Sequence, residues 1–113
     1  MDKKQDKRIR LKAKIRSKIL GTKERPRLSV FRSNRFIYAQ VIDDIKSKTL
    51  ASASDVKVNK GTKTERAKKV GRAIAEVCLK AKIQKVIFDR NGFKYTGRIK
   101  LVADEARRGG LKF

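Results

Sequence analysis

Alternation between hydrophobic and polar positions predicts three strands in the first half of the chain. Three segments are rich in strand-forming residues with a two-residue period, namely 27–33, 36–42 and 48–54. The polar segments between them, 33–35 and 43–47, are short enough to be hairpin turns. Strands joined by short turns pair with their neighbours in the chain, so the pattern predicts a three-stranded antiparallel meander.

A change to three- and four-residue spacing predicts a helix up to residue 82. Thr62 and Glu65 fit a capping box, in which each side chain accepts a hydrogen bond from a backbone N–H group at the helix start. The apolar side chains expected to face the core are Ala67, Val70, Ile74, Val77, Cys78 and Ala81.

A short strand over residues 85–89 and a second helix over residues 98–108 complete the predicted fold. A strand that follows a helix usually returns parallel to a strand of the same sheet. We therefore expect an α/β fold, with a mixed sheet of a three-stranded antiparallel meander plus one crossover strand and two packed helices. The inward side of the second helix should consist of Ile99, Val102, Ala103 and Ala106.

The ends of the chain have their own patterns. Gly109 and Gly110 should end the second helix, which allows Leu111 and Phe113 to fold back onto the core. The first 26 residues contain eleven basic residues, three acidic ones and few apolar ones. Their like charges oppose an isolated helix, so we expect a partly disordered segment that becomes helical when RNA phosphates neutralise it. The predicted organisation is a basic N-terminal arm over 1–26 and a single α/β RNA-binding domain over 27–113.

The charge of the whole chain narrows its partners. Lys and Arg number 33 against 11 Asp and Glu, so the formal net charge is +22. So many positive side chains repel one another and oppose compaction unless a polyanion neutralises them. Nucleic acid is the first candidate for this polyanion, and an anionic membrane surface is the second. The absence of His excludes His-ligated metal sites and Ser-His-Asp triads. The single cysteine, Cys78, cannot form an internal disulfide and suits a reducing, cytoplasmic compartment.

The arm is the first of three basic patches that are candidate RNA contacts. Each phosphate that it neutralises would release a counterion and make the affinity fall with salt. The alternative is a solvated tail that keeps the protein soluble. Arg25 and Arg27, where the arm meets the first strand, are assigned to the RNA-binding set as well. The assigned arm residues are Arg8, Arg10, Lys12, Lys14, Arg16 and Lys18.

The second patch is the turn between the first two strands. A tight turn can enter an RNA groove, guanidinium groups match phosphates, and Asn and Ser side chains reach 2′-hydroxyls or base edges. The two aromatic residues that follow share one face of their strand. They can stack on bases if that face points outward, and they belong to the core if the faces are reversed. The assigned residues are Arg32, Ser33, Asn34, Arg35, Phe36 and Tyr38.

The third patch is the loop over residues 89–97 with the start of the second helix. Basic residues alternate there with Phe93 and Tyr95, a pattern that suits irregular RNA, although both rings can instead anchor the loop to the domain. Arg98 also lies at a helix N-terminus, where backbone N–H groups bind phosphate. The assigned residues are Arg90, Lys94, Tyr95, Arg98 and Lys100.

Three motifs give the chain a family resemblance over essentially its whole length. They are RPRLSVFRSNRFIYAQVID at 25–43, FDRNGFKYTGR at 88–98 and ADEARRGGLKF at 103–113. In order and spacing they resemble the bacterial-type large-subunit ribosomal protein family eighteen, the 5S rRNA binders. The chain departs from many members at Phe36 and Thr96, where those members have His, so a His contact to RNA cannot be carried over.

The resemblance implies a ribonuclease H-like motif and a role in attaching 5S rRNA to the 23S rRNA body in the central protuberance. The implied partners are 5S rRNA, 23S rRNA and neighbouring large-subunit proteins, without a membrane or a small-molecule substrate. The implied location is the large ribosomal subunit in the cytoplasm, with an organellar ribosome left open.

Three other functions were weighed against this one. A nuclease of this fold needs several carboxylates for two metal ions, but the first strand has no acid. Asp89 is expected to pair with an arginine or to accept hydrogen bonds from loop N–H groups. We therefore expect no enzyme activity, no cofactor and no metal. A membrane-bound arm would need aromatic or broader apolar surface. A generic basic RNA-binding or chaperone protein without a specific site is the alternative, and it would not discriminate among RNAs.

Overall fold

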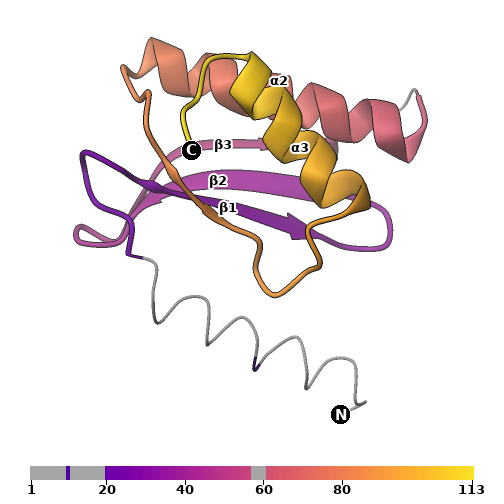
Figure 1. The fold of residues 1–113 in the computed structure, drawn as a ribbon, viewed down its shortest axis with the longest axis horizontal. Coiled ribbons are helices and arrows are strands. Elements are labelled where there is room, and N and C mark those ends of the chain that lie inside the picture. Colours follow the sequence, from indigo (N-terminus) through magenta and orange to yellow (C-terminus); the bar gives the residue numbers. More distant parts are fainter. Residues whose placement is uncertain (1–9, 11–19, 57–60) are drawn as a thin grey trace.

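A computed structural model describes residues 10, 20–56 and 61–113, and its core is a four-stranded sheet with two helices on one face (Figure 1). The strands lie in the order β3-β2-β1-β4. Their bounds are β1 Arg27–Arg32, β2 Ile37–Asp43, β3 Lys48–Ser54 and β4 Ile87–Asp89, and those of the helices are α2 Lys63–Lys80 and α3 Gly97–Arg108.

The pairing of the strands confirms the predicted mixed sheet. β1 pairs antiparallel with β2, and β2 pairs antiparallel with β3, which is the predicted meander. β4 returns after α2 and pairs parallel with β1, as the crossover rule requires. The β2–β3 register shifts between Val41 and Ile42, which marks a bulge in the ladder.

The aliphatic face of the meander packs against the helices. Leu28, Val30, Ile37, Ala39 and Val41 are fully buried, and they alternate along β1 and β2 with residues on the opposite face. Each of these Leu, Val and Ile side chains contributes roughly 1.5–3 kcal/mol when buried. The alternative that placed the aromatic residues of the second strand in this core is therefore wrong.

The first predicted helix begins where expected but faces the core slightly differently. The capping box of Thr62 and Glu65 is present, with the Thr62 hydroxyl accepting from the Glu65 N–H at 3.2 Å. The prediction that Val77 and Ala81 face the core is wrong, because both are exposed and Ala81 is the C-cap residue. Cys78 is buried, and burial raises the pKa of its thiol to about 11.

The end of the chain folds back along β4, as predicted. Leu111 is buried, and Phe113 packs against the core. Lys112 bridges the segment before β4, accepting from the Val86 N–H at 3.1 Å and donating to the Gln84 carbonyl at 2.8 Å. This pairing occupies residues that were predicted to be part of the strand, so β4 is shorter than 85–89 and begins at Ile87.

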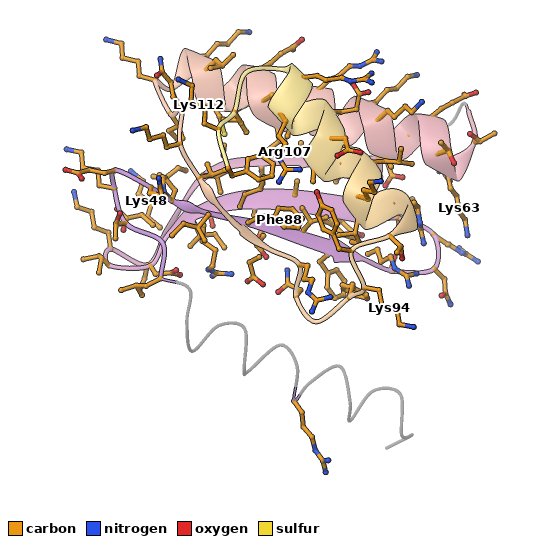
Figure 2. The ribbon with its side chains drawn as sticks, viewed as in Figure 1. Lys48, Lys63, Phe88, Lys94, Arg107 and Lys112 are labelled. Atoms are coloured by element: carbon orange, nitrogen blue, oxygen red, sulfur yellow. The ribbon has the colours of Figure 1, made fainter. Side chains whose placement is uncertain are left out.

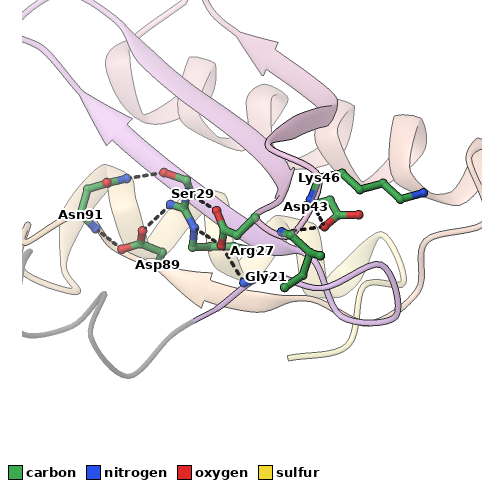
Figure 3. A network of polar contacts seen from close by, with 9 residues as sticks. Gly21, Arg27, Ser29, Asp43, Lys46, Asp89 and Asn91 are labelled. Atoms are coloured by element: carbon green, nitrogen blue, oxygen red, sulfur yellow. Dashed lines mark hydrogen bonds and ion pairs between the residues drawn. The ribbon is translucent and has the colours of Figure 1, made fainter.

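A buried polar network joins β1, β4 and the β2–β3 turn to the segment before β1 (Figure 3). The Arg27 guanidinium donates to Asp44 at 3.0 and 3.1 Å and to Asp89 at 2.7 Å. Asp44 also accepts from the Gly21 N–H at 2.7 Å, and its own N–H donates to the Gly21 carbonyl at 2.9 Å. Burial works against the charge on Arg27, but hydrogen bonds to both carboxylates outweigh it and raise its pKa. The network therefore ties residue 21, β1, the β2–β3 turn and β4 together.

Replacing Arg27 with Met should lower the free energy of unfolding by about 3 kcal/mol, because removing one partner of a buried ion pair leaves the other buried charge poorly compensated. Arg25→Met is the matched control, since Arg25 is exposed, and it should change stability by less than about 0.5 kcal/mol. Urea unfolding of both variants measures the difference. Equal stabilities for the two variants would contradict a structural role for the network.

Candidate nucleic-acid interface

The turn between β1 and β2 is held in a defined shape by its own hydrogen bonds. The Ser33 N–H donates to the Phe36 carbonyl at 2.8 Å, and the Phe36 N–H donates to the Ser33 hydroxyl at 3.1 Å. Asn34 and Arg35 are exposed at its tip, and Arg32 is exposed at the end of β1. The polar side chains of this turn therefore point to solvent from a fixed backbone.

The loop between β4 and α3 lies against this turn. The Arg98 guanidinium donates to the Ser33 carbonyl at 3.1 Å, which links the start of α3 directly to the turn. The Asn91 side chain donates to the Val30 carbonyl at 2.9 Å and to the Ser29 hydroxyl, which fastens the loop to β1. The second and third basic patches, which are far apart in the sequence, therefore form one surface.

Aromatic rings from both segments meet on the sheet face opposite the helices. Phe31 lies 6.2 Å from Tyr38 and 5.5 Å from Phe93, measured between ring centroids, and the Arg32 guanidinium lies 5.1 Å from the Phe93 ring. Phe31 was missed as a site residue. Its signal was available, since strand alternation places it opposite the core residues and antiparallel pairing places it across from Tyr38.

Tyr95 points elsewhere. Its ring contacts Phe88 edge-on at 5.5 Å, and its hydroxyl accepts from Arg107 at 2.9 Å. Phe88 lies beside the buried Leu28 in the sheet, so Tyr95 belongs to the helix side of the molecule. The loop thus sends Phe93 to one face of the sheet and Tyr95 to the other, and Tyr95 anchors the loop as the alternative interpretation proposed.

Three arginines gather at the corner where the turn meets the helix starts. Burial lowers the pKa of Arg98, and the positive charges of Arg32 and Arg66 lower it further, whereas Asp55 opposes the shift. Asp55 is 3.7 Å from Arg66 and also accepts from the Ile37 N–H at 2.8 Å. The corner therefore holds more positive charge than its single carboxylate balances.

Two nitrogen atoms of this corner lack a hydrogen-bond partner. Among the described residues, Arg66 Nε and Arg98 Nη1 are the buried side-chain polar atoms without one. The adjoining start of α3 has no side-chain cap from Thr96 and no acidic residue in its first turn. Both features favour an anion at the corner, because anions stabilise helix N-termini and satisfy guanidinium donors. Arg66 was missed by the sequence analysis because its distance from the turn depends on how α2 crosses the sheet.

The other assigned residues divide into exposed, engaged and undescribed ones. Lys94 and Lys100 are exposed, as are Arg25 and Arg10, whereas Arg90 donates to the Phe93 carbonyl at 3.2 Å. Arg27, which is also assigned to the RNA-binding set, is only 4% exposed, and its guanidinium is bound to two carboxylates. The remaining arm assignments lie outside the described residues, namely Arg8, Lys12, Lys14, Arg16 and Lys18.

The acidic residues near the site have structural partners. Asp89 pairs with Arg27 and accepts from the Asn91 N–H at 2.9 Å, so both expected roles for Asp89 are confirmed. Across residues 10, 20–56 and 61–113, no three His, Cys, Asp or Glu side chains gather in a way that could hold a metal ion. No helix in that same part of the chain is both long and apolar enough to cross a membrane.

Comparison with known proteins assigns a family to this fold and surface. The model of the family described as ribosomal L18 of archaea, bacteria, mitochondria and chloroplasts matches residues 2–113. The large ribosomal subunit protein uL18 of Porphyromonas gingivalis is 58% identical over 111 residues, which cover 97% of each chain. The proteins of the same name from Bacteroides thetaiotaomicron and Sorangium cellulosum are 55% and 54% identical, covering 96% and 94% of each chain. The chain therefore belongs to the ribosomal L18 family of large-subunit proteins.

Proposed function

We propose that this ribosomal protein binds 5S rRNA through the joined surface of the β1–β2 turn and the β4–α3 loop. In the assembled subunit it would help attach 5S rRNA to the 23S rRNA body in the central protuberance, beside neighbouring ribosomal proteins. A large-subunit ribosomal protein has rRNA and other ribosomal proteins as partners. The choice of 5S rRNA rests on the family resemblance of the three sequence motifs.

The observation that carries the proposal is the hydrogen bond from Arg98 to the Ser33 carbonyl. It joins two basic segments that are 65 residues apart into one surface, with Arg32 and Arg35 exposed on one side and Lys94 on the other. A surface of fixed shape with several guanidinium groups can recognise the groove and phosphates of a folded RNA. A merely flexible basic segment would bind any polyanion.

The arginine corner supplies a place for one RNA phosphate. A phosphate there would offset the mutual repulsion of Arg32, Arg66 and Arg98, and it would accept a hydrogen bond from Arg98 Nη1, which has no hydrogen-bond partner in the protein. The uncapped start of α3 adds backbone N–H groups to the same position. Bound RNA would in this way complete a corner that is electrostatically unfavourable in the free protein.

The role is structural rather than catalytic in this proposal. Asp44 and Asp89, two acids on the sheet face opposite the helices, are engaged by Arg27. A two-metal nuclease would need those carboxylates as metal ligands. In this proposal the arm adds further phosphate contacts, including contacts to 23S rRNA, and residues 27–113 form the folded domain.

Replacing Arg32 and Arg35 together with Gln should weaken binding to 5S rRNA by about a hundredfold or more, because each lost charge-assisted hydrogen bond is worth roughly 1.5–3 kcal/mol and about 1.4 kcal/mol is a factor of ten in affinity. The slope of log affinity against log salt should fall by roughly 0.7–0.9 for each lost phosphate contact. A filter-binding titration over a salt series measures both quantities.

The matched control for this variant is Lys69→Gln with Lys80→Gln, which removes the same charge from exposed positions on α2. The control should bind within about twofold of the unaltered chain once salt is near physiological, since distant charges are screened. An equal loss in the two variants would contradict a defined site and favour the generic basic RNA-binding protein.

Deleting residues 1–20 should weaken RNA binding and lower the salt slope while the domain stays folded. The deletion keeps Gly21 and its hydrogen bonds to Asp44, so the buried network is intact. Circular dichroism melting and RNA titration of the truncated chain measure the two properties. Loss of cooperative melting would show instead that the arm is part of the core.

A further inference from the structure

A groove of about 410 Å³ lies along the outer edge of β4, away from the β1–β2 turn. Its walls come from the segment before β1, from β4 and the residues before it, from α3 and from the end of the chain. Figure 2 shows Phe88 and Arg107 near the middle of the molecule and Lys112 toward the end away from Lys63 and Lys94. The lining residues are Arg25, Lys85, Val86, Ile87, Phe88, Arg107, Lys112 and Phe113.

The groove has a cationic rim. Arg25, Lys85 and Lys112 are exposed, Arg107 completes the set, and none of the eight lining residues is acidic. Arg107 is held in place, because it donates to the Phe113 carbonyl at 3.2 Å and to the Tyr95 hydroxyl at 2.9 Å. Its guanidinium also lies 4.4 Å from the centre of the Phe113 ring and 3.9 Å from Asp104, so one acid stands beside this cation of the rim. The Arg107 guanidinium, together with the exposed cations of Arg25, Lys85 and Lys112, is suited to an anionic ligand. Little side-chain entropy is lost on binding at Arg107, because its guanidinium is already held in place.

The floor of the groove is apolar and aromatic. Phe88 and Phe113 are stacked, with their ring centroids 5.6 Å apart and their planes at 12°, and both rings are half-buried. Val86 and Ile87 extend this floor along the strand. An apolar floor under a rim of cations fits a ligand with a flat, weakly polar part and an anionic part, which is the chemistry of a nucleotide.

The groove is separate from the β1–β2 turn, and it meets the β4–α3 loop at Tyr95, which contacts Phe88 and Arg107. It lies where β1 and β4 begin, whereas the turn and the β4–α3 loop lie where those strands end. The six residues of β1 span about 20 Å at roughly 3.3 Å per residue. One nucleotide cannot reach both places, so an RNA contact in the groove belongs to a different nucleotide from those at the turn.

We propose that the groove binds one unstacked nucleotide of an RNA strand, with the base against the apolar floor and the phosphate on the rim of Lys85, Arg107 and Lys112. An acidic peptide that binds by adding a strand to the β4 edge of the sheet fits the groove less well than a nucleotide does. The edge before β4 is already paired with Lys112, and β4 itself offers only three residues. Nucleotide binding in the groove does not depend on whether the β1–β2 turn binds 5S rRNA or another RNA. This site therefore goes beyond the proposed function.

The test is a titration of the full chain with adenosine 5′-monophosphate, followed by ¹⁵N–¹H NMR. Backbone signals of Ile87, Phe88, Lys112 and Phe113 should shift together and saturate as one site. Inorganic phosphate and adenosine, titrated separately, should each bind more weakly than the nucleotide because each makes only part of the contacts. Shifts spread evenly over all basic segments, without saturation in the groove, would overturn the proposal.

Lys85→Gln with Lys112→Gln should weaken nucleotide binding by about fivefold or more, the loss expected for two partly exposed charge contacts. The matched control is Lys63→Gln with Lys69→Gln on α2, which removes the same charge far from the groove and should leave binding within about twofold. Equal losses would overturn the proposal. So would a tetraglutamate peptide that shifts the same signals at lower concentration than the nucleotide, since the occupant would then be an acidic protein segment. Failure of 5S rRNA binding would leave all these outcomes unaffected.

Discussion

An excess of positive charge is the constraint on which the arrangement of this small protein depends. With a net charge of +22, the domain has few carboxylates with which to compensate its buried positive charges. Asp44 and Asp89 hold the buried Arg27, Glu105 holds Arg72 at 2.9 Å, and Asp55 lies 3.7 Å from Arg66. The acids are thus used next to the core, where an unpaired charge would cost most. The turn, the loop and the groove have more cations than acidic neighbours, and those are the surfaces that a polyanion can neutralise.

Arg27 and Arg98 show how position decides what an arginine does. Both belong to the motifs that carry the family resemblance, and both were assigned to RNA contact. Arg27 opens β1 on the sheet face opposite the helices, where two carboxylates enclose its guanidinium. Arg98 opens α3 beside two other arginines and keeps a nitrogen without a partner. Arg27 is thus paired within the protein, whereas Arg98 keeps a donor from which the proposed RNA phosphate would accept a hydrogen bond.

Local patterns were sufficient for most of the fold. Strand alternation predicted the meander and its inward face, the capping box predicted where α2 begins, and the two glycines marked the end of α3. The prediction failed where a side chain's surroundings depend on distant elements. Val77 keeps helical spacing but lies beyond the area that the sheet and α3 cover, and β4 is shortened because Lys112 pairs with the residues before it.

The site was predictable only in its separate parts. Composition and turn chemistry indicated the two basic segments, and antiparallel pairing could have added Phe31 to them. The approach of Arg66 to Arg98 and the division of the loop rings between two sheet faces could not be inferred, since both depend on how the helices cross the sheet. The groove could not be predicted from the sequence either, because its lining residues come from four separate segments of the chain.

The most direct test of the account is the affinity of the full chain for 5S rRNA compared with an unrelated structured RNA of the same length, across a salt series around physiological strength. A fixed surface predicts a preference of about a hundredfold or more that persists as salt rises, since shape and hydrogen bonds are screened less than charge. Equal affinities that fall together with salt would contradict it, because net charge alone would then account for binding.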